Sequence, residues 1–479
     1  MSQSSPGETR QPPHTPPRAA GHWPVVGHTV QFLRSPLAAL ERWGRADASV
    51  VAVSIAGRDV ALVTDPRVAR RVLVDAADNY RKAEIVRDRL GTLQGGSLVL
   101  LEGDAWRERR GTVGAVFTAD RVAGVDSVTA RYTDATVDDW PTEGVVGVQA
   151  TARDLTLAIL ARALFGLDLR GGDSPIHAAA DDVLTRLRLD SPSTYLPEWV
   201  PTPTNRRFRR AVETLHARLD ATVESRRDAT VESRRDGTAD DRRGATVDDR
   251  RGAGEATADG HSTEETGLLG ALAAAGLPTE TIRDELIAFL FAGFDSTATA
   301  LSCTLGSLAA NPEVQASLAA AVDDTADGSL ADAPLADCDL LNAVVRESLR
   351  LYPPQYLLFR EPLTDVSLDG FRLPAGQPIV LAPWLYHRDG RFWDDPETFR
   401  PRRWLDDSPA EDRPDSTYLP YGIGPRRCVG RQMADRLLRT AVAAVCRRRR
   451  LTAEDTLTVS AGPTLALDGG LAVRVDSRE

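Results

Sequence analysis

A single cysteine, Cys428, lies in a glycine-rich segment, Tyr421 to Gly430, that reads YGIGPRRCVG. A helix-forming run follows from Gln432 onward. A thiol has a pKa near ~8.5, and the dipole and N–H groups of a helix N-terminus favour the thiolate. Glycines let the backbone approach a flat ligand closely, and Arg426 could pair with carboxylates on that ligand. The pattern therefore predicts one thiolate beside a flat ligand, and the alternative is a buried cysteine on a glycine-rich loop.

A second candidate segment, Ala292-Gly293-Phe294-Asp295-Ser296-Thr297, lies midway along a long apolar helix that we expect over residues 279–310. A glycine in mid-helix costs about 1 kcal/mol relative to alanine, so Gly293 needs a reason. Either another helix packs closely against it, or it opens a local groove. In the groove interpretation, the acid of Asp295 and the hydroxyl of Ser296 stand beside a bound ligand.

Both segments resemble motifs of the cytochrome P450 superfamily, namely the haem-binding loop F-x-x-G-x-R-x-C-x-G and the helix motif [A/G]-G-x-[D/E]-T-[T/S]. Tyr421 replaces the usual phenylalanine, and Ser296, followed by Thr297, replaces the usual threonine. The resemblance implies haem b (iron protoporphyrin IX) with Cys428 as the thiolate ligand of its iron. The cofactor-binding residues that it implies in these two segments are Tyr421, Arg426, Gly430, Ala292 and Gly293.

The same resemblance implies how O₂ is activated. Two protons must reach the distal oxygen, and the thiolate favours O–O cleavage by donating electron density. Asp295 would relay the protons from solvent, and the hydroxyls of Ser296 and Thr297 would hold water nearby. Serine is freer at χ1 than threonine, so we expect looser coupling between O₂ consumption and product.

Further motifs follow in the family's order. Glu347 and Arg350 match E-x-x-R, and Arg403 in FRPRRW matches an arginine that joins them in relatives. Because a buried carboxylate must be paired, the resemblance implies a buried triad beneath the haem, and a surface ion pair is the alternative. Arg402 stands where the family usually has glutamate.

Trp106 and Arg110 match the family's W-x-x-x-R. At a spacing of four residues they share one helical face, so both could reach the same haem propionate. Arg360 corresponds to another propionate-binding arginine. The alternative for Trp106 and Arg110 is an ordinary helix face.

Residues 21–479 are expected to form one haem domain, mainly α with a small β-rich lobe, the family's triangular helical prism. We expect a β-hairpin over 50–63 that turns at Gly57-Arg58-Asp59, and a helix over Asp339–Leu351. Residues 1–20 are proline-rich and are expected to be disordered. The sequence ATVESRRD occurs at 221–228 and again at 229–236, so 221–265 is expected to be a charged, solvated loop insertion.

Composition limits the partners. The formal charge of −11 argues against nucleic acid. Four cysteines without disulfide or metal spacing favour the cytoplasm, and no run approaches ~18 uninterrupted apolar residues, so we expect a soluble chain without a membrane anchor. Lys82 is the only lysine among 58 basic residues, and aspartate is abundant. Adaptation to high salt, as in a halophile, would explain this skew, and a GC-rich gene is the alternative.

The predicted activity is that of a haem-thiolate monooxygenase that inserts one oxygen atom from O₂ into an apolar, fatty-acid-like or terpenoid-like molecule. The longer segment around HRDGRFWDDPETFRPRRW resembles fatty-acid and microsomal-type members more than the short bacterial type. Electrons are expected from a separate ferredoxin or flavodoxin with its reductase, attracted by arginines around Cys428. The alternatives are a peroxide-driven or isomerising haem-thiolate enzyme and a non-catalytic haem sensor.

Overall fold

The computed structural model describes residues 14–478, apart from 119–121, 123, 172–173, 189–195, 241–267, 327 and 406–412. The chain forms two compact units. Unit 1 comprises Met1–Asp88, Gln355–Thr398 and Ser408–Cys428, and unit 2 comprises Arg89–Pro354, Phe399–Asp407 and Val429–Glu479. The first boundary between the units, after Asp88, lies inside helix α4 (Glu84–Gln94).

Unit 1 contains a five-stranded mixed sheet in the order β1-β2-β8-β5-β3. Strand β2 pairs with β1 and, in parallel, with β8, which in turn pairs antiparallel with β5. A separate hairpin joins β6 to β7. The elements of this unit are α1 (Thr29–Arg34), α2 (Pro36–Gly44), β1 (Val50–Ile55), β2 (Arg58–Val63), α3 (Pro66–Arg70), the π-helix η1 (Arg71–Asp75), η2 (Ala77–Asn79), β3 (Tyr80–Arg81), β5 (Leu358–Pro362), β6 (Val366–Leu368), β7 (Phe371–Leu373), β8 (Ile379–Leu381), α16 (Pro383–Tyr386) and η7 (Asp415–Thr417).

The predicted β1–β2 hairpin is confirmed, but its predicted turn is wrong by one residue. Ile55 pairs with Arg58, so the turn consists of Ala56 and Gly57. Both have positive φ, 51° and 74°, as in the primed turns that match the twist of the flanking strands. A left-handed alanine is uncommon, so the sequence favoured a turn that began at the glycine.

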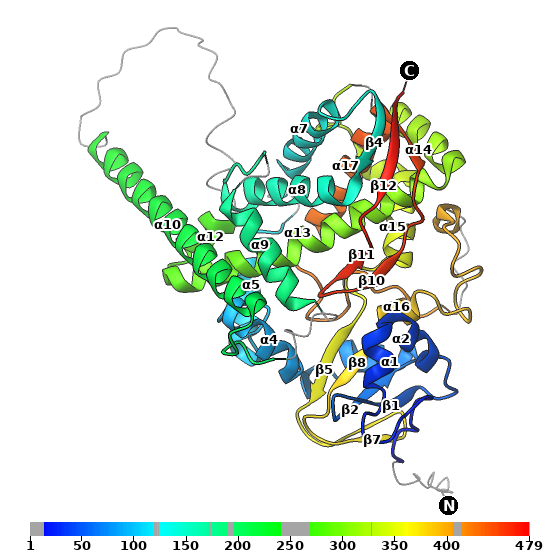
Figure 1. Ribbon diagram of the computed structural model, residues 1–479. Helices are drawn as coiled ribbons and strands as arrows, with labels where there is room; N and C mark the ends of the chain where they lie inside the picture. Colours follow the sequence, from blue (N-terminus) through cyan, green and yellow to red (C-terminus); the bar gives the residue numbers. More distant parts are fainter. Residues whose placement is uncertain are drawn as a thin grey trace, which may run out of the picture. The chain divides into compact units, whose positions relative to one another are not determined.

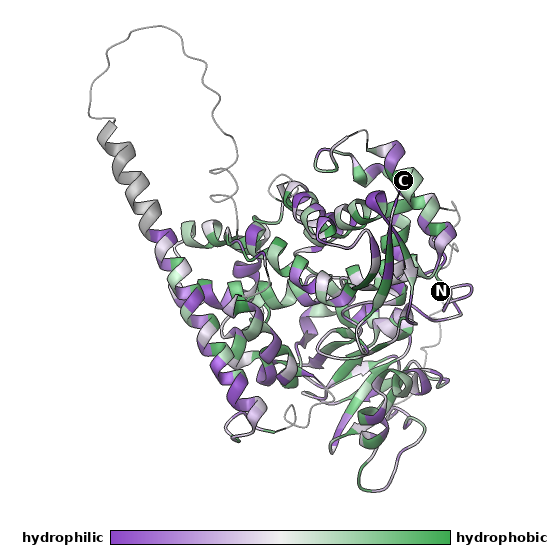
Figure 2. Ribbon diagram, turned by 45° about the horizontal axis from the view of Figure 1, so that its top comes forward, coloured by the Kyte–Doolittle hydropathy of each residue, from purple (hydrophilic) through white to green (hydrophobic). Residues whose placement is uncertain are grey.

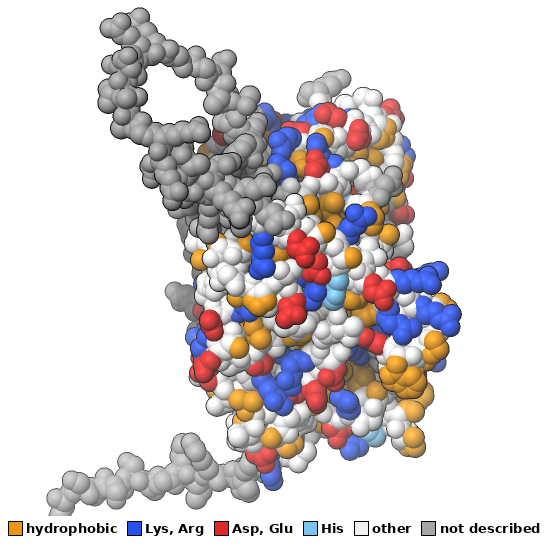
Figure 3. All heavy atoms as spheres, turned by 90° about the vertical axis from the view of Figure 1, so that its left-hand side faces the viewer, with side chains coloured by type: hydrophobic (Ala, Val, Ile, Leu, Met, Phe, Trp, Pro, Cys, Tyr) orange, Lys and Arg blue, Asp and Glu red, His pale blue; other side chains and the backbone are white. Residues whose placement is uncertain are grey.

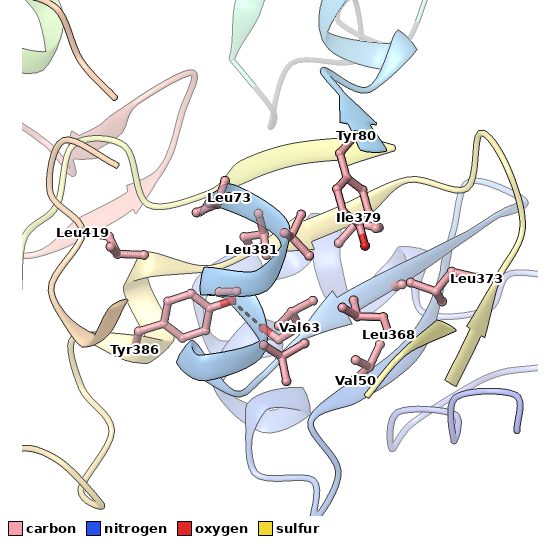
Figure 4. Close-up of a cluster of buried hydrophobic side chains, with 14 residues drawn as sticks. Val50, Val63, Leu73, Tyr80, Leu368, Leu373, Ile379, Leu381, Tyr386 and Leu419 are labelled. Atoms are coloured by element: carbon pink, nitrogen blue, oxygen red, sulfur yellow. Dashed lines mark hydrogen bonds between the residues drawn. The ribbon is translucent and has the colours of Figure 1, made fainter. Parts of the chain in front are cut away.

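Apolar side chains of the sheet and of the helices beside it form the core of unit 1 (Figure 4). Tyr386 ties this core to the sheet, because its hydroxyl donates to the carbonyl of Val63 at 2.8 Å. The next residue, His387, is fully buried, and its Nε2 accepts from the backbone N–H of Leu419 at 2.6 Å. His387 thereby fixes the chain two residues before the Cys428 segment begins.

The prediction that residues 1–20 are disordered is wrong for 14–20, and residues 1–13 lie outside the described part of the chain. His14 bridges to Phe371, and Ala19 donates to and Pro17 accepts from Ala52 of β1. Proline favours extended backbone, and an extended chain can pair with strand residues that still have unpaired backbone groups. The segment is held by this pairing rather than by its own composition.

Unit 2 is mainly helical, and its long helix α13 contacts α8, α10, α15 and α17 (Figure 1). Strand β12 pairs with β4 and β9, and β10 pairs with β11. The elements of this unit are α5 (Gly103–Gly114), α7 (Gly124–Asp138), β4 (Glu143–Gly147), α8 (Val148–Leu160), the π-helix η3 (Ala161–Phe165), α9 (Pro175–Leu187), α10 (Pro203–Asp240), α12 (Leu268–Ala274), α13 (Thr279–Ala309), α14 (Pro312–Thr325), η5 (Leu335–Asp337), α15 (Asp339–Leu351), η6 (Pro401–Trp404), α17 (Arg431–Arg448), β9 (Arg449–Ala453), β10 (Val459–Ala461), β11 (Leu465–Leu467) and β12 (Ala472–Ser477).

Helix α13 confirms the predicted long helix. Glu280 lies in its first turn, and Asn311 and Pro312 follow its last residue, Ala309, by two and three positions. Its apolar composition and 31-residue length would suffice to cross a membrane, but 72% of the most apolar window is buried inside the protein. Other elements surround α13, and this burial explains why the helix is apolar on nearly all of its faces.

The expected loop at 221–265 is partly wrong, because α10 continues to Asp240 and makes the first two repeat copies helical. Residues 241–265 lie outside the described residues. The first copy also contacts other elements: Val223 is fully buried, and Arg227 donates to Thr279 Oγ1 at 2.7 Å. Once a helix is nucleated, it extends through a charged sequence at little cost in free energy. The prediction of a loop was based on composition and did not take this extension into account. Hydrophilic residues are prominent along the coloured part of α10 in Figure 2.

Candidate functional site

Backbone turns fold the Cys428 segment tightly. Gly422 and Gly424 have φ values of 67° and 77°, which favour glycine, and a Cβ at Gly424 would lie 2.0 Å from the carbonyl oxygen of Leu73. The backbone N–H of Cys428 donates to the carbonyl of Tyr421 at 2.9 Å. The two glycines therefore serve the turn itself, and the turn fixes the position of the cysteine.

Cys428 differs from the other three cysteines in its exposure. Cys303, Cys338 and Cys446 are buried, whereas Cys428 is exposed. Burial raises the pKa of the Cys446 thiol to about 12, which makes it a poor thiolate donor. Cys428 lies three residues before the first residue of α17, so the predicted cysteine at the start of a helix is confirmed. An exposed thiol at a helix start fits the thiolate ligand of a haem iron.

Arg426 and Tyr421 are both partly buried, and Gly430 is the N-cap residue of α17. Gly430 has a φ of −83°, and a Cβ there would lie 3.7 Å from Phe117 Cε1, an ordinary contact. The backbone of Gly430 therefore does not require glycine. Its predicted place next to the cofactor stays a prediction.

One stripe of α13, which we call the open stripe, retains solvent exposure in the middle of a largely buried helix. It consists of Phe289, Ala292 and Ser296, spaced three and four residues apart on one face. Ala292 is exposed, whereas Phe291, on another face, is buried. A mainly apolar face of this kind, with one hydroxyl, fits the surface that a porphyrin and an apolar substrate would contact.

Gly293 lies beside the open stripe, and a Cβ at this position would lie 2.9 Å from Leu160 Cδ1 of α8. Thr156 of α8 also donates to the carbonyl of Phe294 at 3.2 Å. The missing side chain of Gly293 thus lets α8 approach α13 closely. The structure supports the helix-packing explanation of this glycine. Its predicted contact with the cofactor stays a prediction.

Asp295 is partly buried, and Thr464 Oγ1 donates to its Oδ2 at 2.5 Å. Burial raises the pKa of this carboxyl, and the hydrogen bond from Thr464 and the charge of Arg153 oppose part of that rise. A carboxyl whose pKa is raised holds a proton more readily than an ordinary aspartate. This property fits the predicted relay.

The two predicted hydroxyls differ in access. Ser296 Oγ donates to the carbonyl of Ala292 at 2.6 Å, so it presents lone pairs to the open stripe and acts there as an acceptor. Thr297 is buried, with 5% of its surface exposed. Of the two, Ser296 is the hydroxyl that a bound molecule on the stripe could reach.

The predicted triad is confirmed as a contact network. Arg350 donates to Glu347 through Nε at 3.0 Å and Nη2 at 2.9 Å, and Arg403 Nε donates at 2.9 Å. Trp404 Nε1 donates at 2.8 Å and the backbone N–H of Arg400 at 3.0 Å, two donors that the motif did not predict. Burial alone would raise the pKa of Glu347, but Arg350 and the other donors hold it below its usual range.

The predicted propionate-binding residues lie on two elements. Trp106 and Arg110 are one turn apart on α5 and are both partly buried, as the spacing predicted. Arg360 lies in β5, where its backbone pairs with Ile379 of β8 and its Nη1 donates to the carbonyl of Phe359 at 2.8 Å.

Sequence reasoning missed a buried cluster at the start of α13. Glu285 is fully buried, and its Oε1 accepts from Arg109 Nη1 and from the backbone N–H of Leu98, both at 2.8 Å. Burial raises the pKa of Glu285, and Arg109 and Leu98 oppose that rise. This bond ties α5 and the 94–98 turn to α13. An acid that precedes Leu286-Ile287-Ala288 in an apolar helix was the signal that could have drawn attention to it.

Several arginines near Cys428 in sequence, which we expected to attract an electron donor, are paired within unit 2. Arg436 donates to Asp126, and Arg448 pairs with Asp134 and Asp138. These contacts reduce the free positive charge on α17. The predicted attraction of an acidic partner therefore depends less on this helix than the sequence indicated.

Comparison with known proteins places these features in a family. The family model for cytochrome P450 matches residues 16–460. The chain is 28% identical to cyclooctat-9-en-7-ol 5-monooxygenase of Streptomyces melanosporofaciens, over 93% of this chain and 92% of that protein. It is also 28% identical to pentalenene oxygenase of Streptomyces avermitilis, over 91% of each.

Among solved structures, the crystal structure of the cytochrome P450DA heme domain has the same fold. Its TM-score is 0.80, with 20% identity over 98% of this chain and 99% of that one. The match over most of its length places the chain in the cytochrome P450 family, as a monooxygenase whose haem is ligated by a cysteine thiolate.

Proposed function

We propose that this monooxygenase hydroxylates an apolar, terpenoid-like molecule that rests on the open stripe of α13. The carrying observation is that stripe: Phe289, Ala292 and Ser296 share one mainly apolar face of α13, where Ala292 is exposed and the other two are partly buried. Two relatives are named for the oxidation of cyclooctat-9-en-7-ol and of pentalenene, which favours a terpenoid over a fatty acid.

Cys428 is the proposed iron ligand. Bound haem supplies the activation of O₂, and the thiolate promotes O–O cleavage by electron donation. Trp106, Arg110, Arg360 and Arg426 are proposed to pair with the propionates, because guanidinium and indole N–H groups are suitable donors to carboxylates. The network around Glu347 keeps η6 attached to α15 within unit 2.

Asp295 and Ser296 are proposed to serve proton delivery. The raised pKa of Asp295 allows it to hold a proton taken from solvent and to release it toward the open stripe. Ser296 offers lone pairs to that stripe because its hydrogen is donated to Ala292. The serine hydroxyl would therefore hold a water molecule by accepting from it.

The proposed partners are O₂ and a separate electron donor, a ferredoxin or flavodoxin with its reductase. On the face in Figure 3, basic and acidic side chains are interspersed rather than gathered by sign. That mixture, with a net charge of −11, offers no extended basic surface on that face for nucleic acid. A soluble, cytoplasmic enzyme with an aspartate-rich, salt-adapted surface remains part of the proposal.

A peroxide-driven or isomerising enzyme, or a haem sensor, would not need delivered protons. The pairing of an acid of raised pKa with an accessible hydroxyl on adjacent residues favours the O₂-dependent reaction. The other functions predict that there is no O₂-dependent turnover for Asp295→Asn to slow.

The ligand and the substrate class can be tested together. The reduced, carbon-monoxide-bound protein should show the red-shifted Soret band of thiolate ligation. Cys428→Ala should lose that band, and Cys446→Ala, a matched change at a buried cysteine, should keep it. Pentalenene and cyclooctat-9-en-7-ol should shift the haem spectrum at lower concentration than lauric acid. A Soret band that persists in Cys428→Ala, or tighter binding of lauric acid, would contradict the respective part of the proposal.

A further inference from the structure

We propose that Thr464 is a positioning residue for proton delivery. Its hydroxyl holds Oδ2 of Asp295 and leaves Oδ1 to exchange protons with water. This inference rests on the proposed role of Asp295. It adds a residue outside every motif that the sequence provided, in the turn between β10 and β11.

The contact is part of a rigid turn. The backbone N–H of Gly462 donates to the carbonyl of Thr464 at 3.0 Å, and a Cβ at Gly462 would lie 2.7 Å from that oxygen. The next residue, Leu465, donates to Pro354 at 2.8 Å and accepts from Thr299 Oγ1 at 3.0 Å. The turn is therefore held to α13 at two points one helical turn apart, through Asp295 and Thr299.

This double attachment constrains the Asp295 side chain. A carboxylate on a helix can adopt several rotamers, and one hydrogen bond from a fixed turn selects among them. Among the described residues, Thr464 is the hydrogen-bond donor to Asp295, and Oδ1 accepts no hydrogen bond from any of them. The carboxylate thus has one held oxygen and one oxygen that accepts no hydrogen bond from the described residues.

Charged groups on two neighbouring helices face Asp295. Arg153 of α8 favours its ionised form, and Asp181 of α9 opposes it. These two residues also pair with each other at 2.5 Å, and Asp181 is 65% exposed. Burial raises the pKa of Asp295, and the Thr464 hydroxyl lowers it by stabilising the carboxylate.

The loss of the Thr464 hydroxyl should therefore have two consequences. The pKa of Asp295 should rise, because the ionised form loses its hydrogen bond. The carboxyl should also lose its fixed orientation, so that proton delivery becomes slower at every pH. A residue that only supported the fold would change neither property.

The first experiment measures protonation rather than turnover. Infrared spectra of the full-length holoenzyme, recorded against pH, follow the protonated-carboxyl band that Asp295→Asn removes. In Thr464→Val, which keeps the shape but not the donor, the midpoint of this band should move to higher pH. Thr464→Ser should restore the wild-type midpoint. Thr299→Val, which breaks the other attachment of the same turn without touching Asp295, should leave it unchanged.

The second experiment measures coupling. With a plant-type ferredoxin and its reductase as electron donor and pentalenene as the probe, hydrogen peroxide released per electron consumed should rise about fivefold in Thr464→Val. It should stay near the wild-type value in Thr464→Ser and Thr299→Val. In an Asp295→Asn background, Thr464→Val should add nothing further, because the group that it positions is gone.

The outcomes separate the two proposals. If Asp295→Asn raises peroxide release and Thr464→Val changes neither the release nor the infrared midpoint, the positioning role of Thr464 is overturned. If Asp295→Asn itself keeps the wild-type ratio, the proposed relay fails, and the role of Thr464 fails with it. Equal effects of Thr299→Val and Thr464→Val would reduce Thr464 to a support of the turn.

Discussion

Two carboxylates of unit 2, Glu347 on α15 and Asp295 on α13, are held in opposite ways. Glu347 is fully buried and accepts hydrogen bonds from two guanidinium groups, an indole and a backbone N–H. Asp295 is partly buried and accepts from one neutral hydroxyl. The first pKa lies below its usual range and the second above it.

The difference shows that burial alone does not decide the ionisation of an acid. Desolvation raises the pKa at both sites, but the positive donors around Glu347 outweigh it. A carboxylate surrounded by charged donors is a permanent ion that anchors other elements. A carboxylate with one neutral donor is able to exchange a proton, which suits a relay and not an anchor.

The strongest way to break this comparison is Glu347→Gln. The change leaves two buried arginine side chains facing a neutral amide, and the loss of one partner of a buried ion pair costs about 3–5 kcal/mol. We expect little folded, haem-containing protein, measured as the ratio of Soret to protein absorbance. Glu397→Gln is the matched control, because Glu397 is an exposed acid that pairs with one arginine at 3.2 Å. Normal haem content in Glu347→Gln would contradict the anchor role.

The contacts of the anchor, Glu347, could be predicted from sequence better than those of the proposed relay, Asp295. Glu347, Arg350 and Arg403 follow fixed spacings, and their contacts are now confirmed. Trp404 and the backbone of Arg400 escaped the prediction, although both lie beside Arg403. Thr464 could not be predicted, since its contact with Asp295 joins residues 169 positions apart and depends on the geometry of one turn.

In the fold, too, local patterns could be predicted and long-range contacts could not. Helices α13 and α15 were predicted almost to the residue, because polar starts and proline stops bound them and apolar residues fill them. The predictions failed where tertiary contact decides the outcome. Residues 14–20 are ordered by pairing with strand residues, and the first repeat copy is helical with Val223 buried.

A pH series should sharpen the comparison with a smaller effect. The lowered folded pKa of Glu347 gives stability that is present above its unfolded pKa and is lost as pH falls through the folded value. The raised folded pKa of Asp295 gives stability that is present below its unfolded pKa and is lost as pH rises through the folded value. The two acids should therefore show opposite slopes.

The measurement is the Tm of the holoenzyme and of conservative variants between about pH 4 and 8. Relative to Asp295→Asn, the wild-type chain should lose stability, measured as a falling Tm, as pH rises. Relative to Glu347→Asp, which keeps the charge but shortens its reach, the wild-type advantage should be greatest above the unfolded pKa of a glutamate, near ~4.3, and should shrink as pH falls below it. Parallel slopes for both acids would show that their environments do not differ as described.

The smallest effect should come from Arg402→Glu, which restores the residue that the family usually has at this position. Arg402 is exposed in η6, whereas its neighbours Arg403 and Trp404 donate to Glu347. The extra cation is therefore in solvent, where a charge change is worth about 0.5 kcal/mol or less. Haem content and Tm should match wild type, and Arg403→Gln, one residue away, should lower both. If Arg402→Glu also destabilises the protein, the total positive charge of η6 stabilises the Glu347 carboxylate. The individual hydrogen-bond donors to Glu347 would then not explain its anchor role.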